Sequence, residues 1–151
     1  MVFFHLILLL GNNIGSSGAS SLSCALLHNS SIQQLDLEGI FYTIFVDNTI
    51  GSFGITSLSN SLLYNSSLFQ LKLASVFIFY YLENHIDDHA VTSLCIALLH
   101  NYSLQQLNLS CIFHSYYCID NTIGDSGASS LSNALLYNSS LLQLIIDGFL
   151  S

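Results

Sequence analysis

The six residues Ile32-Gln33-Gln34-Leu35-Asp36-Leu37 decide the fold, because close copies of them recur along the chain. The copies are Leu68-Phe69-Gln70-Leu71-Lys72-Leu73, Leu104-Gln105-Gln106-Leu107-Asn108-Leu109 and Leu141-Leu142-Gln143-Leu144-Ile145-Ile146. A weaker copy with the spacing Phe4-x-x-Ile7-x-Leu9 lies near the first residue. Self-similarity at a nearly fixed period indicates an array of stacked units, each of which contacts its neighbours.

The residues before each copy predict a helix. In the last unit Asn121-Thr122-Ile123-Gly124 is a turn, a helix is expected from Ser126 or Gly127 to about Tyr137, and the strand follows from Leu141 to Ile146. Apolar residues at i, i+3, i+6 and i+7 give this helix one apolar face. The four faces are Ala19, Leu22, Ala25, Leu26; Ile55, Leu58, Ser61, Leu62; Val91, Leu94, Ala97, Leu98; and Ala128, Leu131, Ala134, Leu135.

The spacing Leu-x-x-Leu-x-Leu, followed by Asn-x-Ile, is that of a leucine-rich repeat. The helix of about three turns and its Gly-x-x-Gly-Ala entry resemble the ribonuclease-inhibitor-like subclass, which also forms the tails of NOD-like receptors and the body of Ran GTPase-activating protein. The resemblance implies an α/β solenoid, a horseshoe fragment with parallel strands on the concave side and helices on the convex side. The activating protein takes a catalytic arginine from a repeat loop, and this chain has no arginine.

Residues 1–151 are expected to form one array of about four units. Solenoids need polar capping units at their ends. Neither end of this sequence has the composition of such a unit, so we expect the chain to be a fragment of a longer array, truncated at both ends.

Three units carry extra residues directly after the strand. The first two copies, starting at Phe4 and Ile32, lie 28 residues apart, whereas the later steps to Leu68, Leu104 and Leu141 are 36, 36 and 37 residues. The extra segments are 39–47, 75–83 and 111–120, and most of their residues are Phe, Tyr, Ile and Val. Since these residue types favour strands, one interpretation is a second parallel ladder along one rim of the solenoid.

The other interpretation is that the extra segments are very short introns read in frame. Gly39, Ser75 and Cys111 all have codons of the form N-GT, and each segment can end in TAG just before the remainder of an Asp or Glu codon. Removing 24, 24 and 27 bases would restore the 28-residue unit in all three places. The amino-acid sequence leaves both interpretations open.

Composition argues against several classes of partner. The chain has a net charge of −8, and Lys72 is its one lysine or arginine. A basic stripe for phosphates is therefore missing, so we expect neither nucleic acid nor an anionic membrane surface as a partner. We expect a cytoplasmic protein with reduced cysteines, because no paired cysteine framework is visible.

Three short motifs suggest chemistry, but the repeat explains them better. Gly124-Asp125-Ser126-Gly127 spells the nucleophile motif of trypsin-like proteases, yet it recurs as a turn and helix start in which Asp and Ser cap N–H groups. His85 and His89 straddle a turn instead of sharing a helix face. The trio Cys111, His114 and Cys118 has no fourth zinc ligand. We therefore expect no enzyme activity, metal or cofactor.

Alternation along the strands predicts a binding surface. If Leu35 and Leu37 point into the solenoid, the residues between them face the concave side. These candidate protein-binding residues are Gln34, Asp36, Glu38, Gln70, Lys72, Gln106, Asn108, Gln143 and Ile145. The constant glutamine column is either part of this surface or a hydrogen-bonded ladder.

The sequence therefore predicts a non-catalytic protein–protein interaction module with a protein partner. The alternative is a wrongly assembled reading or pseudogene fragment with retained introns and no function as written.

Overall fold

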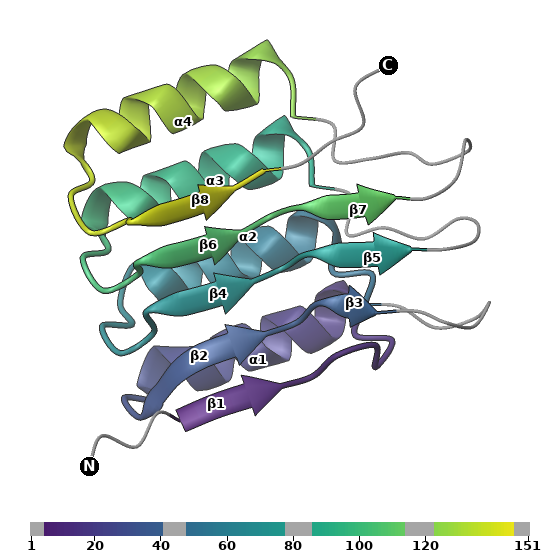
Figure 1. Cartoon of the computed structure of the whole chain (residues 1–151). Coiled ribbons are helices and arrows are strands. Elements are labelled where there is room, and N and C mark those ends of the chain that lie inside the picture. The colour runs from purple at the N-terminus through teal and green to yellow at the C-terminus, as the bar shows by residue number, and fades with distance from the viewer. Residues whose placement is uncertain (1–4, 41–47, 78–85, 114–122, 147–151) are drawn as a thin grey trace.

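The computed structural model describes residues 5–40, 48–77, 86–113 and 123–146. Its helices are α1 (Ser16–His28), α2 (Gly51–Leu62), α3 (Asp88–His100) and α4 (Asp125–Tyr137). The longer sheet contains β1 (His5–Leu8), β2 (Ile32–Asp36), β4 (Gln70–Lys72), β6 (Gln106–Asn108) and β8 (Gln143–Ile145). The shorter sheet contains β3 (Gly39–Ile40), β5 (Ser75–Phe77) and β7 (Cys111–Phe113). Strands and helices alternate along the chain and stack as successive units (Figure 1).

The longer sheet is parallel throughout, in the order β1-β2-β4-β6-β8. Equivalent residues of successive units are partners, so Leu35, Leu71, Leu107 and Leu144 align across four strands. The first three of these leucines are almost completely buried. The predicted α/β solenoid with parallel strands is confirmed, although β8 is shorter than the predicted strand from Leu141 to Ile146.

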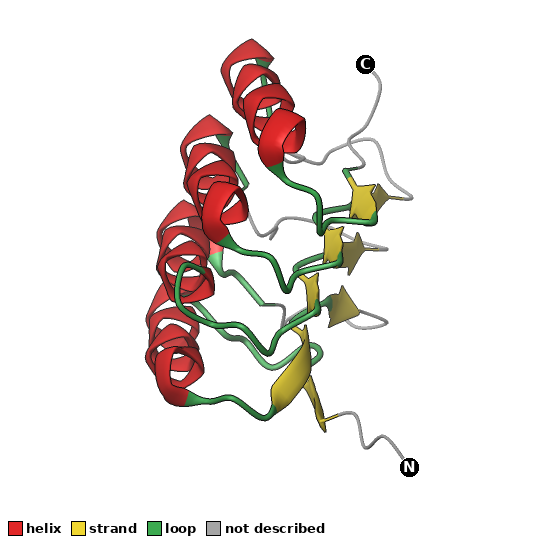
Figure 2. Cartoon of the chain, turned by 90° about the vertical axis from the view of Figure 1, so that its left-hand side faces the viewer, coloured by secondary structure: helices red, strands yellow, loops and turns green. Residues whose placement is uncertain are grey.

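The helices form a single layer on one side of the sheet (Figure 2). The predicted apolar faces of α2 and α3 are buried in full. In the outer helices the prediction was partly wrong, because Ala25 of α1 and both Ala128 and Leu135 of α4 are exposed. Within this chain each outer helix packs against one neighbouring helix instead of two, and that leaves part of its face uncovered.

The beginnings of the three extra segments pair with one another. Parallel strands β3, β5 and β7 align Gly39 with Ser75 and Ser75 with Cys111. They continue beyond the carboxyl ends of β2, β4 and β6 (Figure 1). A second parallel ladder is thus present in the described part of these segments, while residues 41–47, 78–83 and 114–120 lie outside the described residues.

A column of asparagines, two of them buried and the third half-buried, joins the units at the carboxyl ends of the helices. Asn101 Nδ2 donates to the carbonyls of Leu62 and Asn65 in the preceding unit, at 2.7 and 2.9 Å. Its Oδ1 accepts from the backbone N–H groups of Ser103 and Leu104 at 3.0 and 2.8 Å. Asn65 and Asn138 repeat this arrangement. We call this column the asparagine ladder, and it accounts for the recurrence of Asn-x-Ser at Asn65, Asn101 and Asn138.

The start of α4 is capped from the preceding unit. Asp88 Oδ1 accepts from the N–H groups of Gly124 and Gly127, at 2.7 and 3.0 Å. The residue at the N-cap position of α4 is Gly124, which has no side chain to cap the helix. The predicted helix start is confirmed, since α4 begins at Asp125, directly before the predicted Ser126. The expectation that Asp and Ser of this motif cap helix starts is confirmed at Asp87, which caps α3, while α4 is capped by Asp88 of the preceding unit.

Candidate functional site

The predicted site residues lie on one side of the longer sheet, opposite the helices. The register places Gln34, Gln70, Gln106 and Gln143 in one row and Asp36, Lys72, Asn108 and Ile145 in the next. Glu38 lies two residues after Asp36, the last residue of β2. Since neighbouring leucines point into the core, these side chains face away from it. We call the nine residues the strand face, and they are the candidate binding surface.

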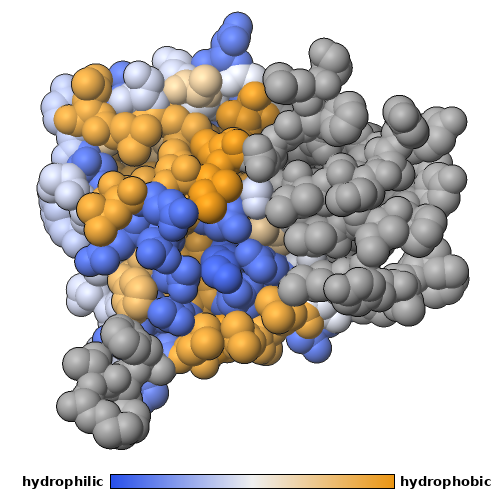
Figure 3. Space-filling model, viewed as in Figure 1, coloured by the Kyte–Doolittle hydropathy of each residue, from blue (hydrophilic) through white to orange (hydrophobic). Residues whose placement is uncertain are grey.

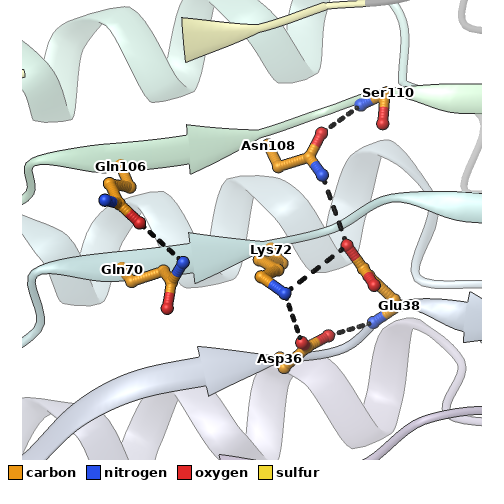
Figure 4. A network of polar contacts seen from close by, with 7 residues as sticks. All are labelled: Asp36, Glu38, Gln70, Lys72, Gln106, Asn108 and Ser110. Atoms are coloured by element: carbon orange, nitrogen blue, oxygen red, sulfur yellow. Dashed lines mark hydrogen bonds and ion pairs between the residues drawn. The ribbon is translucent and has the colours of Figure 1, made fainter. Parts of the chain in front are cut away.

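A polar network crosses three strands of the strand face (Figure 4). Lys72 Nζ lies 3.0 Å from Asp36 Oδ2 and 4.0 Å from Glu38 Oε1. Asn108 Nδ2 donates to Glu38 Oε1 at 3.2 Å. Two of these side chains also fix the backbone beyond the strands, because Asp36 accepts from the N–H of Glu38 and Asn108 from that of Ser110. The three units are therefore tied together on this face by a single chain of contacts.

The two carboxylates of the network share the charge of Lys72 unequally. The hydrogen bond to Asp36 raises the pKa of Lys72 above its ordinary value, so the ammonium is held firmly in its charged form. Burial raises the pKa of Glu38, and the neighbouring Asp36 carboxylate adds to this effect, although Lys72 and Asn108 oppose it. Lys72 thus contacts two carboxylates, and its contact with Asp36 is the shorter one.

The glutamine column is a hydrogen-bonded ladder in part. Gln70 Nε2 donates to Gln106 Oε1 at 2.6 Å. Both side chains remain half-buried, and Gln143 is exposed. The ladder therefore leaves amide groups at the surface that can still bind the backbone or side chains of a partner.

A small hollow of about 60 Å³ lies beside the network. It is lined by Gln70, Leu71, Lys72, Gln106, Leu107, Asn108, Gln143 and Ile145. Hydrophilic residues gather at the centre of this side of the molecule, with apolar areas toward both ends of the strand ladder (Figure 3). The strand face combines charge, amide groups and one aliphatic side chain around a shallow depression, which suits contact with another chain.

A second, larger hollow of about 240 Å³ lies at the carboxyl ends of α2 and α3. Leu63, Tyr64, His100 and Tyr102 contribute to its lining, and both tyrosines are largely exposed. The two asparagines in the lining, Asn65 and Asn101, have their amides committed to the asparagine ladder. This hollow contains no acidic or basic side chain apart from the histidine.

The described residues offer little for catalysis or metal binding. Burial raises the pKa of the Cys95 thiol to about 11, so this group stays protonated near neutral pH. Asp87 accepts from the N–H of Ala90 at 2.9 Å as the cap of α3. No group of three metal-ligating side chains occurs within the described residues, while His85, His114 and Cys118 lie outside them. In the same part of the chain, no helix reaches the length and apolar character of a membrane span.

Sequence reasoning missed the contacts that cross from unit to unit. The asparagine ladder, the Asp88 cap and the Glu38–Asn108 bond join residues 36 to 70 positions apart. The recurring Asn-x-Ser was a visible signal for the first of these. The other two involve residues that differ between units, so repetition gave no sign of them.

Comparison with known proteins supports the fold. No protein-family model matches the chain, and no curated protein does. Among solved structures, actin-binding site 2 of leiomodin-1 superposes with a TM-score of 0.66 over 96% of this chain and 71% of that one, at 16% identity. At this identity the likeness concerns the fold alone: a leucine-rich-repeat-like α/β solenoid of parallel strands and helices.

Proposed function

We propose that this chain is a non-catalytic protein-interaction module that receives its partner on the strand face. The observation that carries the proposal is the contrast between the rows of the sheet. The leucine row is constant and is buried in its first three members, whereas the adjacent row reads Asp36, Lys72, Asn108 and Ile145. Packing in the core determines the residue type in the leucine row, while the residue types in the adjacent row can vary to match a ligand.

The comparison is consistent with this proposal. The leiomodin-1 domain is an actin-binding site. A similar solenoid therefore serves as a binding domain in another protein. We further propose that the repeats are of the ribonuclease-inhibitor-like kind and that the protein works in the cytoplasm, where a receptor tail or regulatory scaffold would meet its partner.

Site-specific photo-cross-linking tests the proposal. A photoreactive amino acid replaces Gln106 on the strand face or, as a matched control, Asn133 on the exposed side of α4. Irradiation in cells should join a discrete protein to the chain from position 106 and not from position 133. If both positions give the same products, or if only the helix position reacts, the strand face is not the docking surface.

A further inference from the structure

We propose that the segment docking on the strand face is basic and places a lysine or arginine side chain against the carboxylate of Glu38. This inference rests on the proposed function and names the chemistry of the partner. It follows from the distribution of charge in the chain, the unequal sharing of Lys72 and the surroundings of Glu38.

The charge of the whole chain is one-sided. Nine acidic residues stand against a single lysine, giving a net charge of −8. That lysine, Lys72, lies within the strand face and already contacts two carboxylates. The chain therefore has no other lysine or arginine with which to attract an acidic partner, and its field favours approach by a cationic one.

Two carboxylates outside the strand face, Asp87 and Asp88, have local compensation. Asp87 caps the first turn of α3, and Asp88 accepts two N–H groups at the start of α4. Helix amino termini carry partial positive charge and stabilise such anions. These groups are consequently engaged within the fold and are poorer anchors for a partner than Glu38, whose contacts with Asn108 and Lys72 are longer, at 3.2 and 4.0 Å.

Glu38 is the under-compensated carboxylate of the strand face. Lys72 makes its short contact, 3.0 Å, with Asp36 and lies 4.0 Å from Glu38. The two carboxylates and one ammonium leave this half-buried cluster with a net charge of −1. Burial raises the pKa of Glu38, which shows that its negative charge is held at a cost that an additional cation would reduce.

The surroundings of Glu38 suit an extended peptide. Lys72 itself shows that an ammonium group can be held between these strands. The uncharged amides of Gln70 and Gln106 and the hollow of about 60 Å³ lie along the same face, where they can receive the backbone and an uncharged side chain. A cation from the partner can approach Glu38 from the open side, because this side chain keeps 17% of its surface exposed.

Fluorescence anisotropy with labelled peptides tests the inference on the full chain. The probes are peptides of equal length in which serine alternates with arginine, glutamine or glutamate. The arginine peptide should bind most tightly, and its affinity should fall as salt is added, because exposed charge pairs are screened. Glu38→Gln should weaken this binding about fivefold, as expected for one partly exposed ion pair. Glu38→Asp keeps the charge and should lose less.

Asp125→Asn is the matched control, because Asp125 is an exposed acid at the start of α4, away from the strand face. It removes the same charge and should change affinity by less than about twofold. Equal losses in Glu38→Gln and Asp125→Asn would overturn the inference, since binding would then follow net charge alone. So would equal affinity for the arginine and glutamine peptides.

The proposed function can survive that failure. If cross-linking at position 106 captures a partner but Glu38→Gln leaves its affinity unchanged, the strand face binds proteins without a cationic anchor. If cross-linking at position 106 fails while arginine peptides still lose affinity in Glu38→Gln, the carboxylate attracts cations but the strand face is not a protein-docking surface.

Discussion

The asparagine ladder should make Asn101→Asp far more costly than its near-identical shape suggests. The substitution keeps the oxygen that accepts from Ser103 and Leu104. It removes the Nδ2 group, which donates to the carbonyls of Leu62 and Asn65 at 2.7 and 2.9 Å. The new carboxylate would therefore meet two carbonyl oxygens in a site where Asn101 is 3% exposed.

The magnitude follows from the two carbonyls that lose the Nδ2 donor. The Leu62 carbonyl loses its partner, at a cost of about 1–3 kcal/mol, whereas the Asn65 carbonyl keeps a long contact of 3.4 Å from the Ser103 hydroxyl and loses less. The free energy of unfolding should therefore fall by about 2–4 kcal/mol. Burial and the two carbonyl oxygens would raise the pKa of the substituted carboxyl above its unfolded value. The loss is then full near neutral pH and shrinks as the pH falls toward about 4, where the carboxyl binds a proton in the folded state.

Asn29→Asp is the matched control, because Asn29 occupies the same position in the first unit. Its Oδ1 accepts from the N–H groups of Ser31 and Ile32, but its Nδ2 donates to no other unit within the described residues. The control carries the same charge at a helix carboxyl end and should cost about 1 kcal/mol or less. Urea unfolding followed by circular dichroism measures both variants. A difference below about 1 kcal/mol between them would refute the role of the ladder.

Four further predictions concern the core, the packing of α2, the network and the extra segments. Leu107→Ala should lower the free energy of unfolding by about 2–5 kcal/mol in the same assay, because Leu107 is 1% exposed; a loss under about 1 kcal/mol would contradict its burial. Gly54→Ala should lower the free energy of unfolding by about 1–3 kcal/mol, since the added Cβ would lie 2.6 Å from the Ile50 side chain. Gly15→Ala is the control and should be nearly neutral, because its added Cβ would meet nothing nearer than 3.8 Å. Equal melting temperatures for the two variants would argue against this packing. The pKa of Glu38 is raised in the folded state, so its charged form destabilises the fold at pH values above the ordinary pKa of Glu. Glu38→Gln should therefore be more stable than the parent near neutral pH, and this gain should disappear in acid. A gain that grows as the pH falls would contradict the raised pKa. If residues 39–47 are part of the protein, the transcript must retain the 24 bases that the intron interpretation removes. Sequencing the transcript and the genomic DNA decides between the two interpretations.

The repeat allowed the framework to be predicted, since core positions are repeated for the same packing reason in each unit. Leu35, Leu71 and Leu107 align as expected, and the polar row between them faces outward. Positions in the outer helices were less predictable, because exposure there depends on how many neighbours a helix has. Leu98 and Leu135 are equivalent in sequence, yet the first is 0% and the second 44% exposed.

The network of the strand face was only partly visible in the sequence. Alternation placed Asp36, Glu38 and Lys72 on one face, but it did not say which carboxylate Lys72 would contact more closely. That choice depends on the stagger between neighbouring strands and on side-chain length. Likewise, the composition of the extra segments fitted either strands or translated introns, and pairing among β3, β5 and β7 became visible only in three dimensions.

Carboxylate footprinting tests the central claim, that the strand face receives a protein partner, most directly. The chain is labelled at its acidic side chains, alone and in complex with the protein captured from position 106, and mass spectrometry measures labelling at Glu38 and Asp125. Docking on the strand face predicts that the partner protects Glu38 while Asp125 is labelled as in the free chain. Unchanged labelling of Glu38 with protection of Asp125 would contradict it, because the partner would then lie on the helix side of the array.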